Sequence, residues 1–300
     1  MSSITFKRFS PKDADAVSQL FRGVYGTRYP QPDVYLPTMI GQQNARRRWY
    51  SLLAWDAKEL VGHAALYRLP GDTHQAELAL LVVHPEARGQ RTATRLSQAL
   101  LARAGRLHLT TLHIKQVTSH PYTQRLARHI GFHNCGVLPD YVTSPFDLAP
   151  QETMVMGCQM IPGHARPLPE VHWLPDCRAL MEPLLLAFGT ESRRDLFTDM
   201  PMTTLYQQHR VEVQIQCLDR RVLAQLGDFP RHWLLSLKLN LSLSFNQDLE
   251  QLSARGFSFN GLMPAPGPSG WLALFHRGAP PRTLYIDCPR MQRLAHCAAR

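Results

Sequence analysis

Residues 88–93, RGQRTA, combine the features with which a protein chain usually binds phosphate. They follow an apolar, strand-like run that ends at Pro85, and they precede a helical pattern of leucines. The amides of a helix's first turn have no partner within the helix, and the helix dipole adds partial positive charge there. Small residues let the backbone approach a ligand, and Arg88 and Arg91 can donate charge-assisted hydrogen bonds. The turn therefore suits a pyrophosphate, and a plain strand-to-helix turn with exposed arginines is the alternative.

Glu77 is a candidate general base eleven residues before Arg88. It lies in AELALLVV, where all other residues are apolar, so we expect it to border a cleft. Partial burial would raise the pKa of its carboxyl group toward neutrality, which suits a proton acceptor. A strand-end glutamate in solvent or in a structural ion pair is the alternative. His63, in VGHAA on the preceding strand, is a second candidate, although a lone histidine in an apolar strand is more often structural.

Three tyrosines stand in a loop rich in proline, VYGTRYPQPDVYLP, at residues 24–37. Tyr25, Tyr29 and Tyr35 could together form a wall against a flat or cationic ligand, because aromatic faces attract cations. Packing of the loop on the domain surface is the alternative. We expect Tyr25 and Tyr29, together with His63, to contact a substrate.

The first half of the chain predicts a scaffold for these residues. Apolar periodicity indicates strands at 4–9, 50–56, 59–69, 75–83, 111–117, from 132 and at 154–161, and helices at 11–23, 38–48, 92–106 and 122–130. The helix at 92–106 connects strands 75–83 and 111–117, which predicts that these two strands are parallel. The expected fold class is α+β, with a mixed sheet that is partly antiparallel and flanked by helices.

A similar order of elements begins again after residues 162–169, PGHARPLP, which have the composition of a linker. We expect strands at 171–174, 211–218, 233–243, 257–262 and 271–275, and helices at 177–187 and 249–255. The sequences GFHNCGVLP and GFSFNGLMP share the pattern G-F-x-x-x-G-x-x-P and start at Gly131 and Gly256. We therefore predict a structural duplication in tandem, with domains at residues 1–163 and 170–300.

The first half resembles the GNAT family, the acetyl-CoA-dependent N-acetyltransferases. The family motif Q/R-x-x-G-x-G/A is matched by Arg88 at its first position and Ala93 at its last, whereas Arg91 replaces a glycine. The run LVVHP before the turn and the later RLARHIGF also fit the family. The resemblance implies direct acetyl transfer from acetyl-CoA to an amine, without a covalent enzyme intermediate. It implies that acetyl-CoA contacts Leu81, Val82, Val83, Arg88, Gly89, Gln90, Arg91, Thr92 and Ala93.

The resemblance also suggests the catalytic groups. Some members carry a glutamate at the point of the strand that Glu77 occupies, and the Val83 N–H would polarise the thioester carbonyl. The tyrosine that often serves as the acid is replaced by Ala127, so Tyr122 or a water would have to protonate the leaving thiolate. The tyrosine loop is similar to that of some bacterial tandem proteins of the family. In the second half, RRVLAQLGDFPRHW at 220–233 lacks the motif, so we expect a degenerate copy that does not bind CoA.

The bulk composition limits the partners. The chain has 300 residues with 33 basic and 23 acidic side chains, a formal charge of +10. The basic residues are scattered and no nucleic-acid motif is present, so we do not expect nucleic acid as a partner. RNA association driven by the net charge is a minor functional hypothesis. The six cysteines show no C-x-x-C spacing, which argues against a metal site. With no apolar signal region and no run of about 18 apolar residues, we expect a cytoplasmic protein that does not enter membranes.

Two functional hypotheses stand beside that of charge-driven RNA association. The first is an N-acetyltransferase whose acceptor is an amine-bearing small molecule or a protein amino group, and Glu77 and the tyrosine loop favour it. The alternative is a non-catalytic CoA-binding or scaffold protein of the same fold, which Arg91 and Ala127 favour. Pairing of two GNAT-like halves within one chain could replace a dimer, so we expect a monomer.

Overall fold

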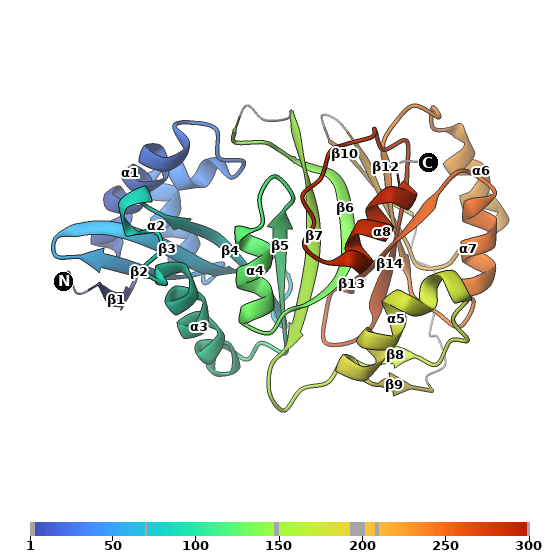
Figure 1. Cartoon of the computed structure of the whole chain (residues 1–300), viewed down its shortest axis with the longest axis horizontal. Helices are drawn as coiled ribbons and strands as arrows, with labels where there is room; N and C mark the ends of the chain where they lie inside the picture. Colours follow the sequence, from blue (N-terminus) through green and yellow to red (C-terminus); the bar gives the residue numbers. More distant parts are fainter. Residues whose placement is uncertain (1–3, 70, 147–149, 193–201, 208–209, 299–300) are drawn as a thin grey trace.

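One sheet of twelve strands crosses the whole molecule, and helices cover both its faces (Figure 1). The structure is a computed structural model, and it describes residues 4–69, 71–146, 150–192, 202–207 and 210–298. The strand order is β1-β2-β3-β4-β5-β7-β6-β13-β14-β12-β11-β10, so that the first seven strands come from the N-terminal half. Within the described ranges, no helix is long and apolar enough to cross a membrane.

The N-terminal half has the order of elements that the sequence predicts. Its strands are β1 (Thr5–Arg8), β2 (Trp49–Asp56), β3 (Glu59–Tyr67), β4 (Gln75–Val83), β5 (Thr111–Val117), β6 (His133–Thr143) and β7 (Gln151–Met160). Its α-helices are α1 (Ala14–Tyr25), α2 (Pro37–Ala45), α3 (Thr92–Ala104) and α4 (Tyr122–His129). β4 and β5 are parallel, which confirms the pairing expected from the connecting helix α3. The mixed α+β architecture is likewise confirmed.

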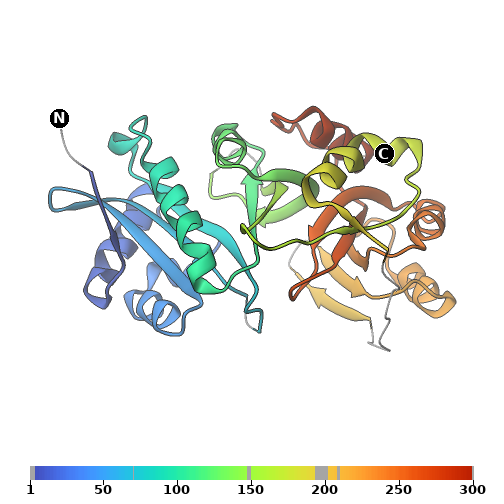
Figure 2. The same ribbon diagram turned by 90° about the horizontal axis from the view of Figure 1, so that it is seen from below.

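Two cores lie on opposite faces of this half of the sheet (Figure 2). On one face, α1 and α2 bury Phe21 and Ile40 against Trp49 of β2. On the other face, α3 buries Leu96 and Leu100, and α4 buries Ala127, with residues of the same strands. Side chains of a strand alternate between the faces, so β4 serves both cores at once.

The C-terminal half repeats the strand order of the first. Its elements are α5 (Pro175–Phe188), β10 (Thr203–Tyr206), β11 (Val211–Ile215), α6 (Arg220–Asp228), β12 (Leu235–Asn240), α7 (Phe245–Ser253), β13 (Ser258–Pro264), β14 (Trp271–Arg277) and α8 (Pro289–Ala298). The order β10-β11-β12-β14-β13 has the pairing pattern of β3-β4-β5-β7-β6, with β11 and β12 parallel and joined by a helix. The topology supports the predicted duplication, which stays a prediction.

The start of this half differs from the prediction. Residues 171–174 are irregular instead of a strand, and Leu174 is the N-cap of α5. Their apolar residues serve packing, because the Trp173 ring lies 5.1 Å from that of Phe245. A two-stranded sheet formed by β8 (Leu168–Pro169) and β9 (Thr190–Glu191) lies beside them. The sequence pattern also did not predict β10, α6 or α8.

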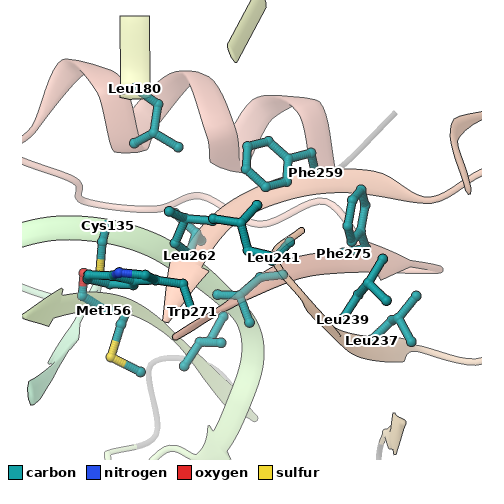
Figure 3. Packing of buried hydrophobic residues seen from close by; sticks show 14 of the residues in the cluster. Cys135, Met156, Leu180, Leu237, Leu239, Leu241, Phe259, Leu262, Trp271 and Phe275 are labelled. Carbon is teal, nitrogen blue, oxygen red and sulfur yellow. The ribbon is translucent and has the colours of Figure 1, made fainter. Parts of the chain in front are cut away.

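The two halves join where the repeated glycines meet. β6 pairs with β13, and the register places Gly136 opposite Gly261. A Cβ atom on Gly261 would lie 2.3 Å from the Cys135 carbonyl oxygen, and one on Gly136 would lie 2.7 Å from that of Leu262. Only glycine therefore allows the two backbones to approach so closely. A single apolar core then continues across the join from Cys135 to Trp271 (Figure 3).

The predicted linker, residues 162–169, is held firmly between the halves. The side chain of Arg166 is fully buried. It donates hydrogen bonds to the carbonyl oxygens of Ala265 at 2.9 Å and Gly270 at 2.7 Å, and to Thr111 Oγ1 at 3.2 Å. The Trp271 indole N–H donates to the Arg166 carbonyl oxygen in return. This network ties the turn between β13 and β14 to the first half.

Candidate active site

A wedge opens in the sheet where β4 and β5 separate. The two strands pair only over Gln75, Ala76 and Glu77, which face Thr111, Leu112 and His113 in that order. Beyond Glu77 the register between β3 and β4 also shifts, because β4 has a bulge at Leu80 with φ +53°. The facing edges of β4 and β5 are thus left without each other as hydrogen-bond partners. An amide-bearing ligand can add to such an edge as an extra strand.

Two cavities follow this wedge. The larger, the wedge cavity, has a volume of about 410 Å³ and is lined by β4, β5, β6 and β7, the end of β3 and the α1–α2, β5–α4 and β6–β7 loops. The smaller, the helix cavity, has about 350 Å³ and lies between α3 and α4. Leu81 and Thr123 line both cavities. Together they form a path from the start of α3 to the centre of the sheet.

The basic turn stands at the outer end of this path. The Arg95 N–H donates to the Arg91 carbonyl oxygen, so the amides of Thr92, Ala93 and Thr94 precede the first helical hydrogen bond. No side chain caps this helix end, and both arginines of the turn are exposed. Arg91 has the left-handed conformation with φ 58°, which explains why the related motif carries glycine there.

Only some of the residues expected to bind the cofactor line one of the two cavities. Leu81 lines both cavities, and Ala93 lines the helix cavity. Val82 points to the opposite face and packs in the core with Phe21, so only its backbone can reach the wedge. Val83 is partly buried and lines neither cavity. Thr92 is buried, and its hydroxyl donates a hydrogen bond to the Ala87 carbonyl oxygen. The remaining turn residues are exposed and also line neither cavity: Arg88, Gly89, Gln90 and Arg91.

The strain at Arg91 leads to a prediction about stability. We expect Arg91→Gly to raise the free energy of unfolding by about 0.5–1 kcal/mol, because the relief of left-handed strain exceeds the added entropy of glycine in the unfolded chain. Arg88→Gly is the matched control, since Arg88 has the same charge and an ordinary φ of −72°. In Arg88→Gly the free energy of unfolding should fall by about 0.5 kcal/mol. Urea unfolding of both variants checks the difference, and equal effects would contradict it.

Glu77 lies in the wedge cavity, but in an ion pair. Its carboxylate accepts a hydrogen bond from Lys115 Nζ on β5, and His113 Nε2 lies 3.7 Å away. Burial alone would raise the pKa of Glu77, but Lys115 and His113 outweigh it and lower that pKa to about 2. The expectation of a pKa raised toward neutrality is therefore wrong. The physical reason is a cation 38 residues away in sequence, on the neighbouring strand.

The same ion pair occurs again in the second half. Glu77 faces His113 in the register of β4 and β5, and Lys115 stands two residues further along β5. Glu212 faces Ser236 in the register of β11 and β12, and Lys238 stands two residues further along β12. Lys238 Nζ donates to the Glu212 carboxylate, and the pKa of Glu212 is also lowered to about 2, because Lys238 and Arg210 outweigh its burial. A pair that is also present in the half without the phosphate-binding motif argues for an architectural role.

His63 does not line either cavity. Its ring is fully buried under β4, where the Nδ1–H donates to the Leu80 carbonyl oxygen at 2.8 Å. The Phe21 ring packs against it at 5.6 Å. Burial lowers the pKa of His63 to about 4, so it is neutral at physiological pH. These contacts place His63 as a support for the bulge at Leu80.

The tyrosine wall lines the wedge cavity at its outer side. The rings of Tyr25 and Tyr29 lie 4.9 Å apart, and Phe146 packs 5.7 Å from Tyr25. Tyr35 lies outside the cavity lining but accepts a hydrogen bond from the Tyr29 N–H at 2.7 Å. The sequence did not identify the other polar and aromatic lining residues, which include Tyr67, Lys115, Ser119, His120, Thr123, Tyr141 and Glu152.

The second half has no corresponding wedge. β11 and β12 stay paired over all five residues of β11, from Val211 to Ile215. The N-terminus of α6 is occupied as well, because the Asp219 carboxylate accepts a hydrogen bond from the Val222 N–H at 2.7 Å. A carboxylate at that helix end competes with a phosphate for the same amides. No group of three metal-binding side chains was found among the described residues of either half.

The wedge, the turn and the bulged strand all lie in one stretch that has known relatives. Residues 14–132 match the model of the acetyltransferase (GNAT) family. Residues 14–132 are thus a GNAT acetyltransferase domain, the class to which the resemblance of the turn pointed. No curated protein matches the sequence.

Solved structures with a similar course of the chain cover about half of it. An N-acetyltransferase from Staphylococcus aureus shares 14% identity with a TM-score of 0.47, over 53% of this chain and 99% of its own. A GNAT acetyltransferase from Streptococcus pneumoniae gives 14% and 0.46, over 53% and 100%. A spermidine N-acetyltransferase variant from Vibrio cholerae gives 18% and 0.44, over 52% and 93%.

Proposed function

We propose that the protein transfers the acetyl group of acetyl-CoA to an amine. The observation that carries this proposal is the separation of β4 and β5 next to an uncapped helix N-terminus, in a GNAT acetyltransferase domain. The pyrophosphate would bind the amides of Thr92 to Thr94, with Arg88 and Arg91 beside it. The pantetheine arm would pass through the helix cavity and pair with the free edge of β4. The thioester would then reach the wedge cavity near Leu81.

We infer that the two halves of the chain have different roles. The first half binds acetyl-CoA and performs the reaction, whereas the second is a degenerate copy without a cofactor site. Support for this division comes from the fully paired β11 and β12 and from the Asp219 cap on α6. The second half would instead brace the strands β6 and β7, which form one wall of the wedge cavity.

Calorimetric titration of acetyl-CoA tests the cofactor site. We expect micromolar binding by the wild type and about 30-fold weaker binding by the double variant Arg88→Ala/Arg91→Ala, since each of the two exposed charge-assisted contacts contributes about 1 kcal/mol. The double variant Arg103→Ala/Arg106→Ala removes the same charge at the other end of α3, and it should bind as the wild type does. If the wild type does not bind acetyl-CoA, the proposed function fails.

Binding without transfer would favour the second candidate. In that case acetyl-CoA binds at the turn, but no primary amine of a test panel raises the rate of CoA thiol release above that of the reaction without enzyme. The ion-paired state of Glu77 is the observation behind this candidate, because it removes the carboxylate first expected to act as base. Such a result would identify a CoA-binding or scaffold protein.

A further inference from the structure

The wedge cavity contains one charge that the described side chains leave unbalanced. Glu77 and Lys115 neutralise each other. Glu152 on β7 also lines the cavity, is only 4% exposed, and accepts a hydrogen bond from Ser144 Oγ at 3.0 Å. Among the described residues, no lysine, arginine or histidine nitrogen lies within 4.0 Å of its carboxylate. Because a buried carboxylate without a cation is costly, the cavity favours a positively charged ligand.

The walls of the same cavity favour that charge as well. Five aromatic side chains line it, Tyr25, Tyr29, Tyr67, Tyr141 and Phe146. Aromatic faces attract cations, and this attraction is strongest where water is excluded. The rings also offer apolar surface to the body of a ligand. A small cation with an apolar body therefore fits the lining best.

A group able to accept a proton faces the same space. The Nδ1 atom of His120 is buried and has no hydrogen-bond partner on any other described residue, and the same holds for Ser119 Oγ and Thr123 Oγ1. All three residues line the wedge cavity. The Tyr122 ring packs 5.1 Å from the imidazole. Orphaned buried polar atoms of this kind point to a ligand that completes their hydrogen bonds.

The surroundings of His120 keep it in the form that accepts protons. Burial lowers its pKa most, a hydrogen bond with its own backbone and the charge of Glu152 raise it, and the charge of Arg88 lowers it. The net effect is a pKa below the usual value, so the ring is neutral at physiological pH. Glu77, by contrast, is held as the partner of Lys115.

We propose that the carboxylate of Glu152 binds the acceptor as an ammonium ion and that Nδ1 of His120 takes its proton. The inference rests on the proposed acetyl transfer and gives its acceptor a class, small primary amines with an apolar or aromatic body. The volume of about 410 Å³ must hold both this body and the acetyl end of the thioester.

The proton and electron balance of the reaction is complete with these groups. His120 takes one proton from the ammonium, and the freed lone pair of the nitrogen forms a bond to the thioester carbon. The carbon–sulfur bond then breaks, its electron pair goes to sulfur, and the second proton of the attacking nitrogen passes to that sulfur. The products are the acetamide and CoA as its thiol, and His120 returns its proton to water.

A binding experiment tests the cation site without turnover. The protein saturated with CoA, which carries no acetyl group, is titrated with 2-phenylethylamine and with 2-phenylethanol, which has the same shape but no charge. We expect the wild type to bind the ammonium at least tenfold more tightly. Glu152→Gln should lose this preference, and Glu152→Asp should keep part of it. Glu59→Gln, which removes an exposed carboxylate at the start of β3, should leave the preference unchanged.

A rate experiment tests the proton acceptor. With 2-phenylethylamine as acceptor, we expect His120→Gln to lower kcat about 100-fold while KM changes little. In the wild type, kcat/KM should rise with pH through the pKa of His120, below 6.5. This limb should be absent in the variant, whose rate should increase with hydroxide instead. A purely structural role of His120 would leave the limb in place.

The outcomes separate the two proposals. Failure of the wild type to bind acetyl-CoA overturns the proposed function itself. If acetyl-CoA binds, equal or absent binding of the two phenylethyl probes by the wild type overturns the cation site. An unchanged pH limb in His120→Gln overturns the proton acceptor. Retained acetyl-CoA affinity in Glu152→Gln and His120→Gln shows that both variants are folded.

Discussion

Gly261→Ala is expected to lower the free energy of unfolding by about 3–5 kcal/mol, because it adds a methyl group where two paired strands approach most closely. The new Cβ would lie 2.3 Å from the Cys135 carbonyl oxygen and 2.6 Å from Gly136 Cα. Both atoms belong to the backbone of β6, so no side chain can rotate away. The residue also has φ +101°, a conformation that residues with a Cβ atom rarely adopt. Relief therefore requires β6 and β13 to separate.

The matched control separates the clash from the conformational strain. Gly163 has φ +87°, but no heavy atom lies within 4 Å of the Cβ that alanine would add. Gly163→Ala should therefore cost only about 1–2 kcal/mol. Urea unfolding followed by tryptophan fluorescence measures both variants, and acetyl-CoA binding shows whether the first half survives. Equal costs at the two positions would mean that the close approach of β6 and β13 does not stabilise the protein.

The sequence identified the glycines of this join but not their contact. The pattern G-F-x-x-x-G-x-x-P is local, so it can be found twice by inspection. The pairing of Gly136 with Gly261 depends on how two distant strands align, and no local pattern encodes that alignment. The same limit explains the linker. Its composition indicates a break between elements, but the carbonyl groups that bind Arg166 lie about a hundred residues away.

The site was predictable to the extent that its parts lie on one segment. The turn with Arg88 and Arg91 and the tyrosine loop are each contiguous, and their residue types alone suggested their chemistry. Glu77 was placed correctly on a strand beside a cavity, but its pKa depends on Lys115, which a sequence pattern cannot bring near.

Glu152 and His120 did have a signal in the sequence. Glu152 is the second residue of β7 and precedes a mostly apolar run, the same argument that selected Glu77, and His120 ends the polar run after β5. What the sequence could not show is that both face one cavity, because β7 and the β5–α4 loop meet only in the folded sheet.

Removing Glu77 is expected to destabilise the protein without revealing a catalytic base. Glu77→Gln leaves Lys115 partly buried without its partner, which should cost about 2–4 kcal/mol at pH 7. Lys115→Met should cost a similar amount for the converse reason. The double variant Glu77→Gln/Lys115→Met removes both charges and should regain most of the stability and of the acetyl transfer. A double variant that folds yet remains 100-fold slower would make Glu77 the base after all.

The ion pair of Glu212 with Lys238 is the control for Glu77, and the stability that both pairs contribute depends on pH. Glu212→Gln should lose stability as Glu77→Gln does, yet leave acetyl-CoA affinity unchanged, because β11 and β12 have no wedge. Both carboxylates have a pKa lowered to about 2 from 4.5, so their contribution is complete above about pH 4.5 and is lost as the pH falls toward 2. The difference in unfolding free energy between the wild type and each variant should therefore narrow below pH 4.5. A constant difference would show that the ion pairs do not set it.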